Sequence, residues 1–131
     1  MNVCELSQLL YLKREIEQSR ERLAELEKRS DEYLETASSM PSLEKITEHR
    51  NIKPEIINLK NTIEAKKKLC VTEYQRLMEF ITGVEDSFMR QILTYRYIDG
   101  FSWVQVAMHI GGGNTGDGVR KAHTRFLKRN T

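Results

Sequence analysis

The sequence predicts an all-α protein in which a long antiparallel helical hairpin, similar to a coiled coil, precedes a small domain of short helices. Three observations lead to this fold class. The N-terminal quarter has no glycine or proline and repeats apolar residues at three- and four-residue steps. A second such stretch follows the proline at position 54, and glycine-containing turns separate short amphipathic segments beyond residue 85. We place the hairpin at residues 1–84 and the small domain at residues 85–131.

The first helix of the hairpin is expected to run from Val3 to Thr36. Ser19 and Ser30 occupy positions that would be apolar in a regular heptad pattern, so the predicted coiled coil is imperfect. The apolar face comprises Leu9, Leu12, Ile16, Leu23, Leu26 and Tyr33.

The second helix of the hairpin is expected to begin at Pro54, which suits a first helical turn, and to end near Gly83. Residues 37–53 are predicted to be a linker with one short helix beginning near Ser42. The apolar face of the second helix comprises Ile56, Leu59, Ile63, Cys70, Tyr74, Leu77 and Ile81. One hairpin cannot cover two such stripes, so we expect a homo-oligomer, most simply a dimer, that associates through residues 3–36 and 54–82.

The composition excludes several classes of protein. The chain has 131 residues, of which 39% are hydrophobic, and no apolar run approaches the 18 or so residues that a membrane span needs. It has no signal-peptide pattern, so we expect a cytoplasmic protein without a membrane partner. Cys4 and Cys70 fit neither a disulfide framework nor a CxxC site and are expected to be free thiols.

No motif in the sequence predicts catalysis. Residues 111–116 contain a GxGxxG pattern, but they follow a predicted helix, whereas a dinucleotide site needs a preceding strand. His49, His109 and His123 lack the spacing and the acidic neighbours of a zinc site. We therefore expect no catalytic residue, no metal site, no cofactor and no enzymatic activity.

The C-terminal domain is predicted to contain three short helices. Thr82–Glu85 resembles a capping box that opens a helix ending at Asp99–Gly100, and Ser102–Gln105 resembles a second box that opens a helix over Trp103–Ile110. Thr115 is expected to cap the third helix. Trp103 is expected to anchor the core, although contact with another protein is an alternative. The buried positions of the second of these helices are expected to be Val106, Ala107 and Ile110, and the third helix is expected to run through Val119, Ala122, Phe126 and Leu127.

The positive charge of the chain is concentrated in this domain. Residues 85–131 carry seven Lys and Arg against four Asp and Glu, and no acidic residue follows residue 118. A basic final helix after two shorter ones is typical of a helix-turn-helix domain, whose last helix enters the major groove of duplex DNA. The run Lys66–Lys68 is a second basic segment, for which a solvated helix face is the preferred interpretation and a nucleic-acid contact the alternative.

The run RYIDGFSWVQVAMHIGGGNTGDGVRK, residues 96–121, resembles the fourth-region domain of bacterial sigma factors. It is more closely similar to small sigma-factor-like proteins of phages, prophages and mobile elements of Gram-positive bacteria. The resemblance covers about a third of the chain and implies that the last helix binds DNA and that the domain also contacts RNA polymerase.

Individual site residues follow from this resemblance. Thr115 matches the helix cap of the motif, Asp117 its acidic base-contacting position, Arg120 a basic reader of bases and Lys121 a polar reader. Two positions that are commonly basic in the family are glycines here, at 116 and 118. We include Thr124, Arg125 and Lys128 among the predicted DNA contacts.

These features together predict a sequence-specific, duplex-DNA-binding transcriptional regulator of phage type. Two alternatives remain. The small subunit of a phage terminase also combines oligomerising helices with a helix-turn-helix, but its DNA-binding domain usually comes first. The other alternative is an adaptor that contacts RNA polymerase and does not bind DNA.

Overall fold

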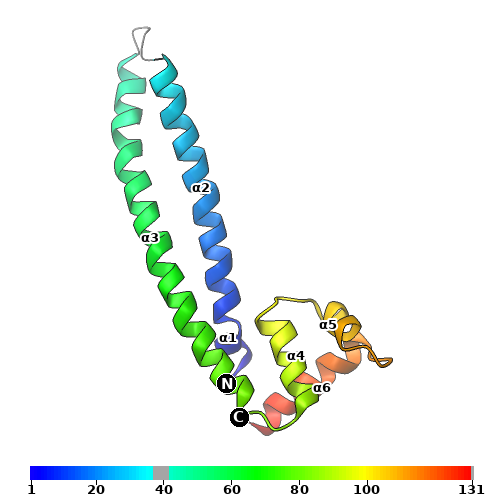
Figure 1. Cartoon of the computed structure of the whole chain (residues 1–131). Helices are drawn as coiled ribbons and strands as arrows, with labels where there is room; N and C mark the ends of the chain where they lie inside the picture. The colour runs from blue at the N-terminus through cyan, green and yellow to red at the C-terminus, as the bar shows by residue number, and fades with distance from the viewer. Residues whose placement is uncertain (37–41, 131) are drawn as a thin grey trace. The chain divides into compact units, whose positions relative to one another are not determined.

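The computed structural model describes residues 1–36 and 42–130, and this part of the chain is all-helical. The predicted all-α class is thereby confirmed. Six helices and no strand are present among the described residues (Figure 1). None of these helices is long and apolar enough to cross a bilayer.

The N-terminal helix is divided into two parts near its start. α1 spans Val3–Leu6 and α2 spans Gln8–Thr36, whereas the sequence predicted one helix from Val3. Ser7 keeps right-handed helical dihedrals, and its N–H still donates to the Val3 carbonyl at 3.0 Å. At the interruption the Gln8 side chain donates to the Cys4 carbonyl at 3.1 Å.

The second long helix differs more from the prediction. α3 spans Leu43–Thr82 without interruption and contains Pro54 in its interior. The expected helix start near Ser42 and the end near Gly83 are confirmed. The expected separate helix starting at Pro54 was wrong, because one helix runs through this position. Proline removes one backbone donor from the helix, but the helical turns that precede Pro54 bury Ile52, which is 5% exposed. The packing of Ile52 therefore outweighs the preference of proline for the first turn of a helix.

The chain divides into two compact units. The first contains Met1–Leu12 and Cys70–Thr131, and the second contains Lys13–Leu69. The predicted functional division at residue 84 stays a prediction, because this division concerns compactness and not function.

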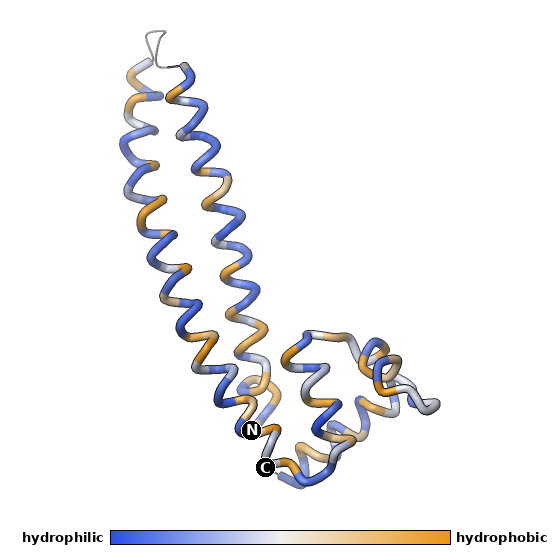
Figure 2. The backbone as a smooth tube through the Cα atoms, in the orientation of Figure 1, coloured by the Kyte–Doolittle hydropathy of each residue, from blue (hydrophilic) through white to orange (hydrophobic). Residues whose placement is uncertain are grey.

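The second unit is built from α2 and α3, which lie side by side in opposite directions (Figure 1). Ion pairs connect the two helices at successive levels, for example Lys66–Glu15 at 2.9 Å and Arg22–Glu55 at 3.4 Å. Residues of low solvent exposure recur at heptad spacing on both helices, and within this unit the most buried are Ile16, Leu26, Ile52 and Ile63. Apolar and polar segments accordingly alternate along both helices in Figure 2.

The first unit encloses a hydrophobic core to which α1, the two ends of the long helices and the three short helices all contribute. Its fully buried side chains include Leu6, Ile92, Leu93 and Val106. Tyr74, predicted on the apolar face of the second helix, is exposed, because the buried line of α3 passes through residues 70, 73 and 77. Both cysteines are free thiols, as predicted.

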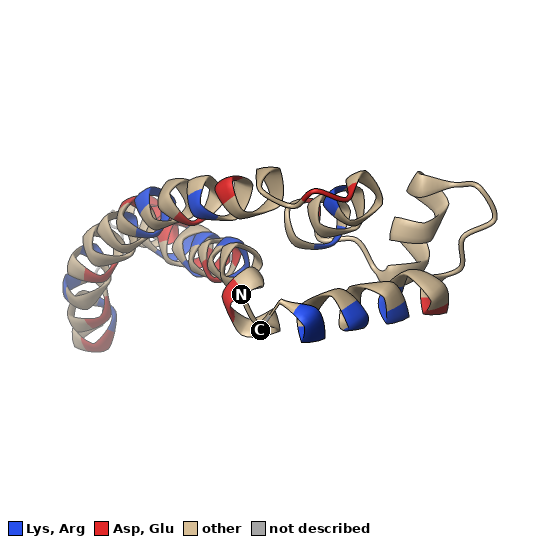
Figure 3. Cartoon of the chain, turned by 90° about the horizontal axis from the view of Figure 1, so that it is seen from below, with Lys and Arg blue, Asp and Glu red and all other residues tan. Residues whose placement is uncertain are grey.

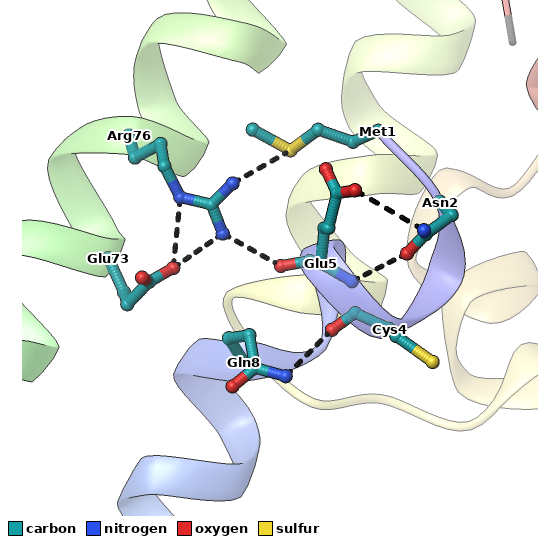
Figure 4. Close-up of polar contacts among 7 residues, drawn as sticks. All are labelled: Met1, Asn2, Cys4, Glu5, Gln8, Glu73 and Arg76. Atoms are coloured by element: carbon teal, nitrogen blue, oxygen red, sulfur yellow. Dashed lines mark hydrogen bonds and ion pairs between the residues drawn. The ribbon is translucent and has the colours of Figure 1, made fainter.

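Arg76 fastens the N-terminal segment to α3 within this unit (Figure 4). Its guanidinium pairs with Glu73 at 2.6 Å, donates to the Glu5 carbonyl at 3.0 Å and lies 3.8 Å from the Met1 sulfur. The Glu5 carbonyl belongs to the last turn of α1, where it also accepts from the N–H of Ser7, the C-cap residue. Arg76 therefore ties the end of this short helix to α3.

Three short helices complete the first unit: α4 at Ser87–Tyr97, α5 at Trp103–Ile110 and α6 at Gly116–Arg129. Each of the three packs against the other two. The expected capping box at residues 82–85 was wrong, because Thr82 is still the last residue of α3. Instead, the Asp86 carboxylate accepts from the Phe88 N–H at 3.0 Å and caps α4.

Candidate nucleic-acid interface

α5 begins with the capping box that the sequence predicted. The Ser102 hydroxyl accepts from the Gln105 N–H at 3.2 Å, and the Ser102 N–H donates to the Gln105 side chain at 2.9 Å. These reciprocal bonds satisfy backbone groups that a helix start leaves open. Val106 and Ala107 are buried as expected, so α5 presents a fixed face to α4 and α6.

A tight turn over residues 111–115 connects α5 to α6. Gly111, Gly112 and Gly113 have φ values of 73°, 66° and 79°. The Asn114 amide donates to the Gly111 carbonyl at 2.7 Å and closes the turn. Because this GxGxxG pattern joins two helices, it lacks the strand that a dinucleotide site requires.

Both glycines at the start of α6 have a steric explanation. A Cβ added to Gly116 would lie 3.1 Å from the Val104 nitrogen, so glycine permits α6 to begin directly against α5. A Cβ added to Gly118 would lie 3.0 Å from the Thr115 hydroxyl, which accepts from the Gly118 N–H at 3.0 Å. The predicted cap at Thr115 is confirmed, and close packing and capping account for glycine at these two positions.

The inner face of α6 carries a residue that the sequence did not identify as buried. His123 is 3% exposed, and its Nε2 lies 2.6 Å from the Tyr97 hydroxyl. The Trp103 ring packs on His123 at 4.8 Å, and the Arg96 guanidinium lies 4.3 Å from the centre of the Trp103 ring. The predicted anchoring role of Trp103 agrees with these contacts. His123 follows Val119 by one turn, and that spacing was the available signal.

Burial shifts the pKa values of both members of this pair. It lowers the pKa of His123 to about 4, with a smaller contribution from the Arg96 charge. It raises the pKa of Tyr97 to about 12. Both groups are therefore neutral near pH 7, and this buried pair holds α4 and α6 together without a charge.

The outer face of α6 carries the predicted DNA-binding side chains. Asp117, Arg120, Lys121, Thr124, Arg125 and Lys128 are all exposed. Figure 3 shows the cations as a row along one side of α6, with an acidic residue near the start of the helix. The opposite side of the helix is buried, so folding fixes the direction in which this row points.

Asp117 organises the first two cations of this row. Its carboxylate accepts from Arg120 at 2.7 Å and from Lys121 at 3.0 Å. The hydrogen bonds from these two side chains, the Arg120 bond first, lower the pKa of Asp117. The carboxylate stays charged at neutral pH and holds both cations at the first turns of α6.

The two threonines of the predicted site use their hydroxyls within the helix. Thr115 caps α6, and the Thr124 hydroxyl donates to the Arg120 carbonyl at 3.0 Å. Arg125 and Lys128 lie further along the same exposed side. The cationic side chains are therefore the part of the predicted set that is presented outward, while the threonines support the helix.

The second basic segment, Lys66–Lys68, belongs to α3 and to the other compact unit. Lys66 pairs with Glu15 at 2.9 Å, and Lys67 pairs with Glu64 at 3.1 Å. These ion pairs favour the interpretation of a solvated helix face.

Apolar exposure on α5 is a further feature that the sequence did not indicate. Val104 is 62% exposed and Met108 is 75% exposed, one turn apart on the same side of the helix. Val104 contacts the start of α6 at Gly116.

Comparisons with known proteins supply no further assignment. No protein-family model, no curated protein and no solved structure matches this chain.

Proposed function

We propose that this protein is a sequence-specific duplex-DNA-binding transcriptional regulator of phage type, similar to the fourth region of sigma factors. In this proposal α4, α5 and α6 form a helix-turn-helix domain, and α6 enters the major groove. The paired α2 and α3 act as a coiled-coil-like hairpin through which two copies of the chain associate. The protein acts in the cytoplasm.

The observation that carries the proposal is the two-sided character of α6. Its inner side chains, including Val119 and His123, are buried against α4 and α5. Its outer side presents Arg120, Lys121 and Arg125 to solvent. Arginine and lysine on one side of an exposed helix suit contacts with guanine edges and with phosphates.

A matched pair of double variants tests the DNA-binding surface. Arg120→Ala with Lys121→Ala removes two cations from α6, and Lys67→Ala with Lys68→Ala removes two cations from α3. We expect the first variant to lose affinity and sequence preference, because a base-reading arginine contributes about 1 to 3 kcal/mol. The second variant should lower general affinity slightly or not at all. Lys66 is left in place because its ion pair with Glu15 belongs to the helix pair.

The measurement is fluorescence anisotropy with duplexes from the genomic region around the gene, after footprinting has located a bound segment. Circular dichroism on each variant excludes unfolding as the cause. Parent affinity should fall steeply with salt, and each phosphate contact that is removed should lower the slope by about one. Parent-like binding by a folded Arg120/Lys121 variant, together with lost binding by the α3 variant, would contradict the assignment to α6.

A second candidate function is supported by the exposed side chains of α5. Val104 and Met108 form a small apolar surface, and such surfaces often bind another protein. In this alternative the chain is an adaptor that contacts RNA polymerase. In that case replacing Met108 with Ser would weaken capture of RNA polymerase, and neither the parent chain nor this variant would bind duplex DNA.

A further inference from the structure

The two flanks of the α2–α3 pair have different chemistry within the second unit. One flank is closed by an ion-pair network in which Arg22 contacts both Glu25 and Glu55 at 3.4 Å, and Arg29 contacts Glu25 at 2.6 Å. These side chains satisfy one another across the two helices. Covering this flank with another protein would therefore provide little stabilisation.

The other flank contains a groove of about 390 Å³. Ile56 and Ile57 form its apolar floor, and Ile57 is 59% exposed to solvent. The side chains around the groove are Glu27, Ser30 and Asp31 from α2 and Lys53 and Lys60 from α3. We call this surface the Ile57 groove.

The apolar character extends along α2 beyond the groove. Leu34 is 61% exposed and follows Glu27 by seven residues, which places it on the same side of α2 two turns later. Ala24 precedes Glu27 by three residues, is also exposed and lies on the same side. An apolar line on both helices beside the buried seam is the pattern of a helix pair that packs against further helices.

Charge identifies the partner of this surface. The α2 wall of the groove is acidic, with Glu27 and Asp31, and the α3 wall is basic, with Lys53 and Lys60. A two-fold axis through the groove would set the acidic wall of each copy against the basic wall of the other. This division makes the surface complementary to itself, whereas a groove with a single sign of charge would repel its own copy.

We propose that the Ile57 groove is the surface on which a second copy of this chain docks, with two-fold symmetry and with α2 of each copy against α3 of the other. The inference rests on the self-association part of the proposed function and does not depend on DNA binding. In the docked state the Lys60–Glu27 contact, 3.6 Å within one chain, becomes part of a four-sided charge cluster around the two Ile57 side chains.

Sedimentation velocity on the full chain, over a range of micromolar concentrations, tests the position of the interface. Ile57→Glu should weaken self-association at least about tenfold, since it places an acid in an apolar contact. Leu69→Glu is the matched control, because Leu69 is also on α3 and is 53% exposed. The two positions are twelve residues apart and so differ by about 120° around the helix. The control should retain the dimer.

A charge exchange tests the symmetry and also guards against misfolding. The variant Lys53→Glu with Lys60→Glu makes the groove acidic, and Glu27→Lys with Asp31→Lys makes it basic. Neither should self-associate, whereas an equimolar mixture should form a heterodimer. Recovery in the mixture would also show that both variants are folded.

The possible outcomes separate the two claims. A parent chain that stays monomeric at all concentrations would overturn both the self-association proposed above and this inference. A parent dimer that Ile57→Glu leaves intact, or a mixture that does not recover, would overturn only the assignment to the Ile57 groove.

Discussion

The buried His123 makes the stability of the first unit depend on pH in a direction that the structure fixes. Burial lowers its pKa to about 4, from an ordinary value of 6.5. The folded state therefore prefers the neutral imidazole, and the unfolded chain binds a proton more readily. Full stability is present above the unfolded pKa, and it is lost as the pH falls from there through the folded pKa.

The size of the effect follows from the two pKa values. At a pH of about 5.5 the unfolded chain is mostly protonated at His123 while the folded chain is not, which costs about 1.4 kcal/mol of unfolding free energy. Well below the folded pKa the loss reaches its limit of about 3 kcal/mol, since each pKa unit corresponds to about 1.4 kcal/mol. The milder condition is preferable, because most carboxylates remain ionised there.

Urea unfolding followed by tryptophan fluorescence measures this loss directly. Trp103 is the only tryptophan of the chain, and its ring lies 4.8 Å from the His123 ring. The free energy of unfolding is compared between about pH 7.5 and about pH 5.5. His123→Gln serves as the reference variant, because glutamine retains hydrogen-bonding groups and does not titrate.

We expect the parent chain to lose about 1.4 kcal/mol more than the glutamine variant over this interval. The subtraction removes the contributions of all other titratable groups. An equal loss in both proteins would refute the reasoning, because His123 would then titrate alike in the folded and unfolded chains.

Three further predictions concern contacts of the first unit. Gly116→Ala should lower the free energy of unfolding, measured in urea melts, by about 1 to 3 kcal/mol, because the new methyl group would lie 3.1 Å from the Val104 backbone nitrogen. An unchanged free energy of unfolding would show that α5 shifts to accommodate the methyl group. Trp103→Ala should cost about 3 kcal/mol by removing the ring between Arg96 and His123, as measured by thermal melting at 222 nm, while the α2–α3 pair stays helical. Arg76→Met should lower the free energy of unfolding by about 1 kcal/mol and speed hydrogen exchange in residues 3–6. Unchanged exchange in these residues would show that Arg76 does not hold α1 against α3.

Local sequence signals predicted the short helices well wherever the controlling contacts are local. The Ser102–Gln105 capping box and the Thr115 cap both form as expected, since each depends on residues three positions apart. The signal at Thr82 failed because a cap also requires the preceding helix to have ended. α3 continues through Thr82, so Asp86 caps α4 instead.

Tertiary packing decides the features that the sequence could not predict. Pro54 reads as a helix start, but burying Ile52 against α2 requires helical turns on its N-terminal side. The hydrogen bond of His123 is made to Tyr97, which is 26 residues away in the sequence, and no local sequence pattern predicts a pair at that separation. The charged row of α6 was predictable, and so was the pairing of Asp117 with Arg120, because the two residues are three positions apart on one helix.

The turn over residues 111–113 constrains how this gene can change over evolutionary time. Gly111 lies at φ 73° and ψ −153°, a region that only glycine occupies without strain. The next two residues also have positive φ, at a cost of about 1 to 2 kcal/mol each for an ordinary L-residue. A descendant protein in which all three glycines were replaced would lose a free energy of unfolding comparable to the whole stability of a small domain. Selection should therefore preserve these three glycines, whereas exposed positions of α2 and α3 outside the Ile57 groove can change more freely.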